Sequence, residues 1–474
     1  MCCERTKSMA LHSGTNEQAD QAISSTADLL PAKASSLHRS AHVIDTHCDT
    51  PLRIIDPETW LPCLDIGQPT QLMVDIPKLQ SAGVSIQVFA ANTGGYALDG
   101  GGQNFSKSNS RLLALVHAIH HVLTHRSHEV GPVTCAPDLE KRPGQGRIGI
   151  LASIEGAYSF CPESAHELLR QYHDLNIRML SPVWNNSNAL GEGVAGQYPD
   201  QSPSAGGLTE LGQAVIRDMN DLGIIIDVSH MNEKTFWDTL AISKAPVIAS
   251  HSSAYALCPH VRNLKDDQIR AIADTGGVVQ VNFHRPFLSA DPSLATLDTV
   301  VAHIDHIVKV GGIDAVGLGS DFDGADMPAE LSDASKLPDL TRALLQHGYH
   351  DDQIVKILGE NSARLFNRVF ALATAASSVD SGLVIHTDIG MGEARDRMAP
   401  LSAHYTLSPD AVLDTSRVRI ILDGISHPAT VDPAAKTISW TPPPALPEAF
   451  HAVTFSAACQ GCPDVRHTVI YHLR

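Results

Sequence analysis

The sequence predicts an α/β protein: a (β/α)8 TIM-like barrel followed by a small C-terminal β-sandwich. Between residues 42 and 370, short apolar runs rich in β-branched residues alternate with longer stretches of helical periodicity. Eight such short runs can be counted, which is the number of strands that closes a barrel of this kind. Beyond residue 378 the alternation stops, and only short strand-like runs separated by Pro, Asp and Gly remain.

Taken in order, the elements begin with residues 1–40, which are rich in Ser, Ala, Thr and Gln and which we expect to form a disordered leader. We assign the hydrolase barrel to residues 41–371 and the sandwich to residues 380–474. The eight expected barrel strands are residues 42–47, 84–91, 148–155, 178–184, 224–230, 247–252, 278–283 and 316–321. Apolar residues three and four apart predict helices at 111–125, 167–175, 211–222 and 352–370.

The C-terminal region has no recognisable catalytic constellation. Its expected strands are residues 383–387, 418–422, 437–441, 453–457 and 469–472, and an immunoglobulin-like sandwich is one arrangement that they fit. Cys459 and Cys462 form a lone Cys-x-x-Cys. A zinc ribbon needs a second such pair, so a local disulfide or two inert thiols is the favoured interpretation.

Composition limits the classes of function. The chain has 474 residues, 43% of them hydrophobic, and 52 Asp and Glu against 34 Lys and Arg give a formal charge of -18. This charge argues against nucleic acid and anionic membrane surfaces as partners. No stretch reaches the roughly 18 to 20 apolar residues of a membrane span, and the start lacks the apolar core of a secretory signal. Nine cysteines, an odd number, argue against an extracellular disulfide framework, so we expect a cytoplasmic protein.

Candidate metal ligands cluster at the carboxyl ends of the expected strands, where barrel enzymes place their chemistry. They are His47, Asp49, Glu155, His230 and His251, and Asp321 lies at the same mouth as a candidate acid/base residue. Imidazole nitrogens and carboxylate oxygens are the ligands that zinc takes in catalytic sites. His230 or His251 alone is better explained as a core histidine whose ring is satisfied by hydrogen bonds. Together, these five ligands favour a two-metal site.

The spacing of these residues suggests how they would share two ions. His47 and Asp49 lie two apart on an extended segment and point to the same side, so both can reach one ion. His230 and His251 end neighbouring strands and can reach a second. Glu155 ends an otherwise apolar strand, where a buried carboxylate is costly unless it is paired or bound to metal, so a bridging position is the simplest interpretation.

Two further acidic residues follow the last barrel strand. Asp321 comes after a run of small residues and suits a general base, with a turn or helix-capping aspartate as the alternative. Asp323, next to Gly324, is more typical of a turn. Arg262, considered by itself, is only a loop arginine, a residue that more often lies on the surface.

These motifs resemble the renal, or membrane, dipeptidase family of the amidohydrolase-like barrels, over about residues 42–370. The resemblance rests on His47-x-Asp49, Ile154-Glu155-Gly156, Asp227-Val-Ser-His230, Ser250-His251-Ser-Ser, Arg262-Asn-Leu and Gly319-Ser-Asp-Phe-Asp-Gly324. It implies a binuclear zinc dipeptidase with two Zn²⁺ per chain, in which His47 and Asp49 bind one ion, His230 and His251 bind the other, and Glu155 bridges them. It also implies that Asp321 is the acid/base group, that Arg262 receives the free carboxylate of a small peptide-like substrate, and that the protein forms a homodimer.

The expected mechanism is attack on the amide by a hydroxide that bridges the two zinc ions, with Asp321 moving the proton to the departing amine. The sequence departs from the family at the end of the fourth strand, where Trp184 stands in place of a histidine that contacts the scissile carbonyl. We expect Trp184 and Asn185 to contact substrate, and Asn185, Asn188 or His284 to replace that histidine. Two alternatives remain: hydrolysis of N-acyl amino acids, lactams or modified peptides, and a catalytically inactive barrel that serves as a binding module.

Overall fold

The computed structural model describes residues 30–93, 104–140, 147–197, 206–373, 381–444, 446–447 and 449–473. A parallel sheet forms the centre, with strands in the spatial order β6-β5-β4-β2-β1-β9-β8-β7. They are β1 (Val43–Cys48), β2 (Val84–Asn92), β4 (Ile148–Glu155), β5 (Ile177–Ser181), β6 (Ile225–Ile226), β7 (Ile248–Ala249), β8 (Val278–Val281) and β9 (Val316–Leu318). A parallel bridge between Asp227 and Ile248 joins the two ends of this order, so the sheet closes on itself.

The predicted barrel is therefore confirmed, and every strand expected from the sequence has a counterpart. One strand was not predicted: β3 (Val130–Pro132) pairs with β4 outside the main order. Strand residues such as those of β4 are buried throughout, because side chains fill the barrel interior and helices cover its outside.

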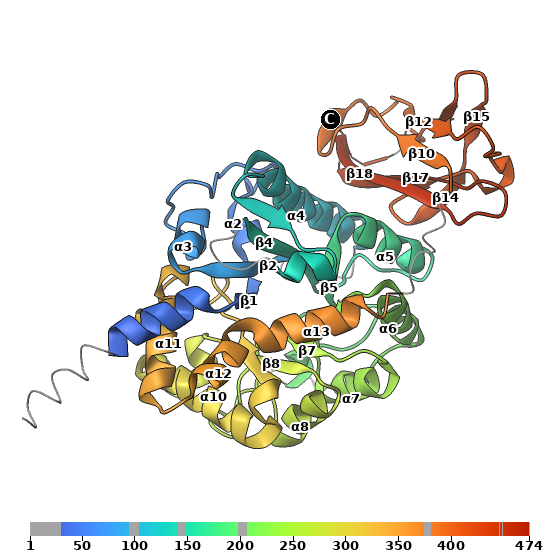
Figure 1. Cartoon of the computed structure of the whole chain (residues 1–474). Coiled ribbons are helices and arrows are strands. Elements are labelled where there is room, and N and C mark those ends of the chain that lie inside the picture. The colour runs from blue at the N-terminus through green and yellow to red at the C-terminus, as the bar shows by residue number, and fades with distance from the viewer. Residues whose placement is uncertain are drawn as a thin grey trace, which may run out of the picture.

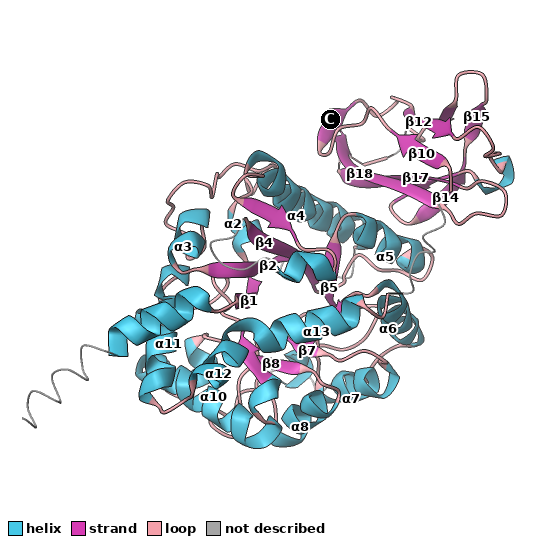
Figure 2. Cartoon of the chain, viewed as in Figure 1, coloured by secondary structure: helices cyan, strands magenta, loops and turns pink. Residues whose placement is uncertain are grey.

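Helices surround the strands on the outside of the barrel (Figures 1 and 2). The longer ones are α4 (Phe105–His125), α5 (Ala165–Asp174), α6 (Glu210–Leu222), α7 (Glu233–Ile242), α8 (Asp266–Asp274), α10 (Leu297–Gly311), α11 (Leu337–Gln346) and α13 (Asn361–Phe370). Shorter helices are α2 (Thr50–Arg53), α3 (Ile76–Ser81), α9 (Arg285–Leu288) and α12 (Asp351–Val355). The helix predicted at 352–370 is thus divided into α12 and α13 by a π-helical turn, Lys356–Glu360.

The end of the expected leader is ordered, which corrects part of that prediction. Residues 30–40 form a helix, and the ring nitrogens of His38 lie 2.7 Å from Thr341 Oγ1 of α11 and 2.7 Å from the Ala82 carbonyl oxygen. Leu30, Ala34 and His38 are four residues apart, so they share one helical face, and the last two are buried against the barrel. Residues 1–29 lie outside the described residues.

The C-terminal region consists of two sheets that share one hydrophobic core. One has the order β10-β12-β16-β15 and the other β11-β18-β17-β13-β14. Their bounds are β10 (Leu383–His386), β11 (Glu393–Arg395), β12 (Leu401–Leu407), β13 (Arg419–Leu422), β14 (Ile425–Pro428), β15 (Thr430–Asp432), β16 (Thr437–Trp440), β17 (Phe450–Ala457) and β18 (Val465–Leu473). The five predicted runs correspond to β10, β13, β16, β17 and β18, and four strands were missed. Cys459 and Cys462 are free thiols, so the local disulfide is not formed.

Strand β17 joins the sandwich to the barrel. Its side chains alternate: Val453 and Phe455 belong to the core of the sandwich, whereas Phe450 and Ala452 pack into the hydrophobic cluster of the barrel. In Figure 1 the sandwich lies beside α4 and α5. One face of the five-stranded sheet is therefore covered by the barrel.

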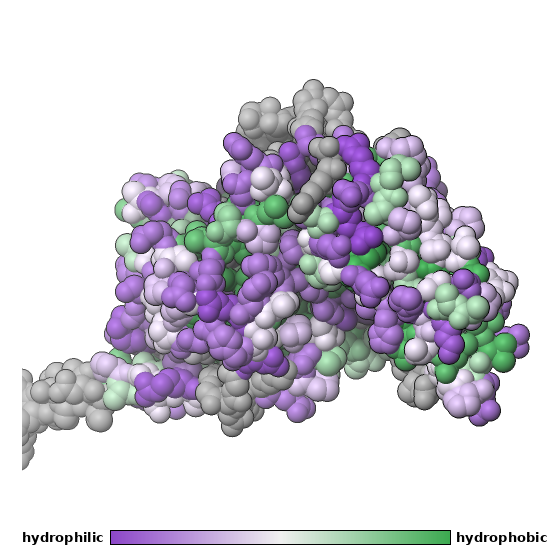
Figure 3. All heavy atoms as spheres, turned by 90° about the horizontal axis from the view of Figure 1, so that it is seen from above, coloured by the Kyte–Doolittle hydropathy of each residue, from purple (hydrophilic) through white to green (hydrophobic). Residues whose placement is uncertain are grey.

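On the face of the molecule shown in Figure 3, hydrophilic and pale residues predominate, as the acidic composition would suggest. Within the part of the chain that the structure describes, we find no helix with the length and apolar character needed to cross a bilayer.

Candidate metal centre

The barrel brings all six predicted side chains to one place. His47 lies in β1 and Glu155 is the last residue of β4, while the remaining four follow the carboxyl ends of β1, β6, β7 and β9. Because every strand is parallel, these ends open at the same mouth of the barrel. The residues are Asp49, His230, His251 and Asp321, together with the two named first, and all are buried or nearly so.

Glu155 lies at the centre of the cluster. Its Oε1 is 2.8 Å from His230 Nε2 and 3.3 Å from His251 Nε2, and its Oε2 is 3.6 Å from His47 Nε2. The carboxylate therefore faces the histidines of both expected ligand pairs. This is the position that a bridging ligand needs.

A second group forms around His47. Its Nε2 lies 3.8 Å from Asp49 Oδ2 and 4.0 Å from Asp321 Oδ1. The potential ligand atoms of His47, Asp49 and Asp321 lie within 4.8 Å of one another, as do those of His47, Glu155 and His251. The two groups share His47, so they are adjacent parts of one site.

Three buried atoms of this cluster have no hydrogen-bond partner among the described residues: His47 Nε2, Asp49 Oδ1 and Glu155 Oε2. Buried polar atoms are rarely left in this state, and three together need an explanation. A cation at this position would satisfy all three. Imidazole and carboxylate donors with no thiolate fit zinc in a catalytic site, so the residues present fit the metal that the sequence predicts.

Hydrogen bonds fix which nitrogen of each histidine faces the centre. Ser250 Oγ donates to Asp227 Oδ2 at 2.6 Å and lies 2.8 Å from His251 Nδ1, so it accepts the Nδ1 proton. Asn185 Oδ1 accepts in the same way from His230 Nδ1 at 2.8 Å. The lone pairs on Nε2 of His230 and His251 therefore both point inward, and the two Nε2 atoms are only 2.8 Å apart. Two lone pairs this close repel each other unless a cation lies beside both.

The backbone around the ligands has an unusual conformation. His230 has φ 68° and Asp321 has φ 67°, in the left-handed region that non-glycine residues rarely adopt. Gly324 is required for another reason: a Cβ at this position would lie 1.9 Å from Asp49 Oδ2. Asp323 does not face the cluster, because its carboxylate accepts hydrogen bonds from Thr50 Oγ1 at 2.7 Å and Met73 N–H at 2.6 Å. Asp323 is therefore structural, but it ties distant segments to the loop after β9 rather than bonding the turn at Gly324 that the sequence predicted.

Burial and acidic neighbours make the centre favourable for added positive charge. Burial raises the pKa of Glu155 well above its ordinary value and that of Asp321 to about 6. Burial alone would lower the pKa of His47, but the carboxylates of Glu155, Asp49 and Asp321 outweigh it and raise that pKa to about 10. In the metal-free protein the excess negative charge is therefore partly neutralised by protons.

A cavity of about 160 Å³ opens onto these ligands, and Trp184, Arg262, His284 and Phe287 also line it. Arg262 is only 3% exposed, its Nη2 donates to the His251 carbonyl oxygen at 3.2 Å, and its guanidinium lies 5.5 Å from the centre of the Phe287 ring. The Trp184 ring lies 5.8 Å from the ring of His230. Asn185 lines the cavity too, but its side-chain oxygen already accepts from His230.

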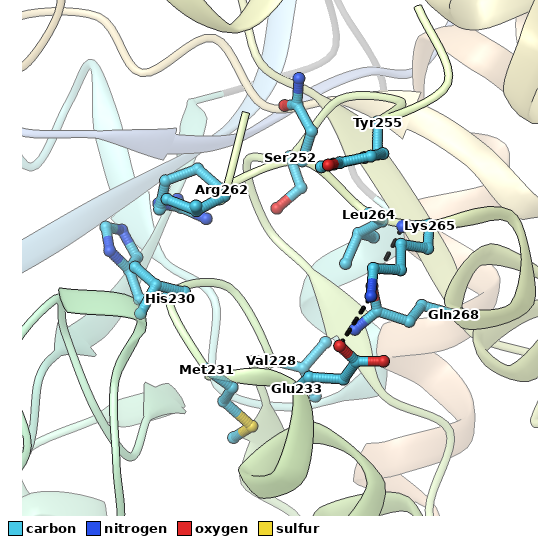
Figure 4. A pocket seen from close by; sticks show the side chains of 13 residues that line it. Val228, His230, Met231, Glu233, Ser252, Tyr255, Arg262, Leu264, Lys265 and Gln268 are labelled. Atoms are coloured by element: carbon cyan, nitrogen blue, oxygen red, sulfur yellow. Dashed lines mark hydrogen bonds and ion pairs between the residues drawn. The ribbon is translucent and has the colours of Figure 1, made fainter. Parts of the chain in front are cut away.

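A second cavity, of about 190 Å³, shares Arg262 and His230 with the first. Figure 4 shows these two side chains on one side of it and the ion pair of Lys265 with Glu233, 2.7 Å between Nζ and Oε2, on the other. Ser252 Oγ points into the space between them and is buried without a hydrogen-bond partner among the described residues. Arg262 thus borders two adjoining cavities.

Sequence reasoning missed the residues that hold the ligands in place. Asp227 and Ser250 orient His251, and Asn282 Nδ2 donates to Asp321 Oδ2 at 2.9 Å. Asp45 accepts from Ser320 N–H at 2.8 Å and so ties β1 to β9. Each is a polar residue within an apolar run, one to three positions from a ligand or a strand end. That placement was a usable signal.

Comparison with known proteins identifies the family. Residues 31–379 match the membrane dipeptidase family, peptidase family M19. An uncharacterized protein in the pqqA 5′ region of Klebsiella pneumoniae is 41% identical over 252 residues, 52% of this chain and 92% of that protein. An uncharacterized dipeptidase of Schizosaccharomyces pombe is 31% identical over 367 residues, 74% of this chain and 86% of that protein. A crystal structure of a metallopeptidase from Rhodobacter sphaeroides, liganded with a phosphinate mimic of the dipeptide L-Ala-D-Ala, has a TM-score of 0.60 and 29% identity and covers 70% of this chain and 99% of that chain.

The family match extends over the barrel and ends before the sandwich begins at β10. The relatives of known fold carry the same barrel, and the metal-ligand cluster described above lies inside the matched region. The chain therefore belongs to the membrane dipeptidase family, peptidase family M19, and is a metallo-dipeptidase, a hydrolase that acts on peptide bonds.

Proposed function

We propose that the barrel hydrolyses dipeptides with two zinc ions, one held by His47 and Asp49 and the other by His230 and His251, with Glu155 bridging them. The observation that carries this proposal is the group of buried ligand atoms around Glu155 that find no hydrogen-bond partner in the described part of the chain. When bound, zinc in such a site lowers the pKa of water so that hydroxide forms near neutral pH, and it polarises the scissile carbonyl.

Asp321 is the proposed acid/base group. Its Oδ2 accepts from Asn282 Nδ2 at 2.9 Å, which fixes the carboxylate, and its Oδ1 lies on the side of His47. Oδ1 is therefore placed to take the proton of the attacking water and to pass it to the departing amine. Asn282 holds this geometry without taking part in the proton transfer.

Arg262 is the proposed site for the free carboxylate of the dipeptide. A planar, permanently charged guanidinium binds a carboxylate through two parallel hydrogen bonds, and here it is buried in the wall of the cavity that also holds Glu155 and Asp321. A cavity of about 160 Å³ suits a small substrate. The phosphinate mimic of L-Ala-D-Ala in the Rhodobacter sphaeroides relative supports dipeptides, including those with a C-terminal D-residue, as the class to test.

His284 is the best candidate for the contact with the scissile carbonyl that a histidine makes in the family and that Trp184 replaces here. The backbone N–H of Asp326 donates to His284 Nδ1 at 3.2 Å, so the neutral ring carries its proton on Nε2 and can donate from there. Asn188 is engaged elsewhere, because its Nδ2 donates to the Pro182 carbonyl. Asn185 lines the cavity, and although its Oδ1 accepts from His230, its Nδ2 is a second donor that can reach substrate. We therefore assign substrate contact to Trp184 through its ring, and to His284 and Asn185 through hydrogen bonds.

The test compares zinc-loaded protein on L-Ala-L-Ala and L-Ala-D-Ala with the same dipeptides capped by a C-terminal amide and with N-acetyl-alanine. We expect cleavage of free dipeptides and strongly reduced cleavage of the capped ones. Cleavage of N-acetyl-alanine in place of dipeptides would favour the alternative amidohydrolase. A protein that binds no zinc and cleaves none of these compounds would instead fit a binding module.

Metal analysis tests the number of ions independently of activity. We expect mass spectrometry of the purified protein, after zinc loading and desalting, to find about two zinc ions per chain, as a two-metal mechanism requires. A stoichiometry of one at saturation would overturn the bridging role of Glu155.

A further inference from the structure

The tip of the β13–β14 hairpin connects the sandwich to the barrel through buried polar contacts. Asp423 and Gly424 form its turn, both with positive φ (48° and 80°). The Gly424 N–H donates to Gln171 Oε1 of α5 at 2.6 Å, and Gln171 Nε2 donates back to the Ile421 carbonyl at 3.1 Å. Gln171 is completely buried, so the hairpin is docked at a defined position on α5.

A chain of hydrogen bonds runs from this turn into the barrel. Asn109 Nδ2 of α4 donates to Asp423 Oδ1 at 3.0 Å. The Tyr172 hydroxyl of α5 lies 2.7 Å from both Asn109 Oδ1 and Ser159 Oγ. Because an amide oxygen can only accept, Tyr172 donates to Asn109 and accepts from Ser159. Asn109, Tyr172 and Ser159 are all at least 96% buried, so water does not compete for these bonds.

Ser159 belongs to the loop that directly follows Glu155. Its neighbour Tyr158 donates through its hydroxyl to the Asn186 carbonyl oxygen at 2.8 Å. Asn186 in turn follows Asn185, whose side chain holds His230 Nδ1 at 2.8 Å. The loop that Ser159 anchors is therefore connected to two metal-ligand candidates, Glu155 through the chain and His230 through Asn185.

We propose that the sandwich positions the metal centre: Asp423, through Asn109 and Tyr172, fixes the loop at Ser159 and thereby the placement of Glu155 and His230. The inference rests on the proposed function, because it assigns Glu155 and His230 to the metal. It gives the sandwich, which lies outside the family match, a role in the reaction of the barrel. Metal ligands tolerate little displacement, so the partners that orient them influence metal affinity as well as rate.

The test uses Tyr172→Phe, which removes the two hydrogen bonds that Tyr172 makes in the chain and keeps the ring that packs 5.7 Å from that of Phe160. The control is Thr468→Val, which removes another bond between the sandwich and α5, from Thr468 Oγ1 to Asp174 Oδ2 at 2.8 Å, together with the contact of Thr468 Oγ1 with Thr454 Oγ1 at 2.8 Å. Neither bond belongs to the chain that runs from Asp423 through Asn109 and Tyr172 to Ser159. Zinc affinity is measured by chelator competition, and kcat and KM are measured on a dipeptide. Thermal melting reports whether each variant is folded.

We expect Tyr172→Phe to lower zinc affinity and kcat about tenfold each, with little change in KM, and Thr468→Val to leave all three unchanged. Ser159→Ala, which cuts the chain at its loop end only, should reproduce the losses if Tyr172→Phe folds poorly. Wild-type zinc affinity and kcat in both Tyr172→Phe and Ser159→Ala would overturn the inference while the proposed function stands. A wild-type protein that neither binds zinc nor cleaves dipeptides would refute the proposed function itself.

Discussion

Replacing Gly324 by alanine should disable the metal centre while leaving the fold intact. A Cβ at residue 324 would lie 1.9 Å from Asp49 Oδ2, and ordinary contact begins at 3.4 Å. The Asp49 carboxylate would therefore have to retreat by 1.5 Å, the difference between 3.4 and 1.9 Å. Asp49 is a proposed ligand, and a displacement of about 1 Å at a reacting centre can cost about 100-fold in rate.

The fold should tolerate the substitution because the added methyl group meets a side chain that can move. The nearest atoms are all carboxylate atoms, of Asp49 and Asp321, and the φ of Gly324 lies outside the left-handed region. Alanine also restricts the unfolded chain relative to glycine, which offsets part of any strain by about 0.4 to 1 kcal/mol. We therefore expect a melting temperature within a few degrees of wild type for the metal-free protein, but kcat/KM reduced about 100-fold and weaker zinc binding.

Gly390→Ala is the matched control. A Cβ there would meet only Glu393, at 3.6 Å, which is ordinary contact, and its φ is likewise outside the left-handed region. The assay is dipeptide hydrolysis with zinc titration by chelator competition on both variants. Wild-type activity and zinc affinity in Gly324→Ala would refute the reasoning, because Asp49 could then not be a positioned ligand.

Three further predictions concern the centre and the sandwich. Glu155→Gln should lose zinc binding and activity together. Its melting temperature should stay near that of the metal-free wild type, because burial already favours a neutral group at this position. A fully active variant would contradict the bridging role. Arg262→Ala should raise KM about 10- to 100-fold for free dipeptides, because the hydrogen bonds from the guanidinium to the substrate carboxylate are lost. The increase should be much smaller for amide-capped dipeptides, and equal effects in steady-state kinetics would remove Arg262 as the carboxylate site. In the sandwich, burial would lower the pKa of His451, but the carboxylate of Asp423, 2.6 Å away, outweighs it and raises that pKa above 6.5. Stabilisation from this pair is therefore complete below about pH 6.5 and is lost as pH rises through the raised pKa. The free energy of unfolding in urea should decline over this pH range in the wild type but not in His451→Gln. The same dependence of unfolding free energy on pH in both proteins would exclude a contribution from the pair.

Much of the barrel could be predicted because its signal is local. Each of the eight strands is an apolar, β-branched run, and the parallel order follows from the helices between them. The short helix at residues 30–40 was missed because few apolar residues, Leu30, Ala34 and Leu37, mark its inner face within a Ser- and Ala-rich segment. β12 was missed although Leu401, Ala403 and Tyr405 alternate with polar residues and point inward. Of these three, only Leu401 is strongly apolar, so the run does not stand out as a strand.

The order of strands and helices along the chain is enough to show which residues reach the mouth of the barrel. A residue at the carboxyl end of a parallel strand faces that mouth whatever its neighbours are, so His47, Glu155 and His251 could be located from strand ends alone. Tertiary structure decided what holds them there. Asp227 with Ser250, Asn185 with His230 and Asn109 with Asp423 are contacts between separate segments, up to 314 residues apart in the last case. Hydrogen-bond partners are set by distance and direction in space, and no local periodicity records them, so only the folded chain shows how its metal centre is oriented.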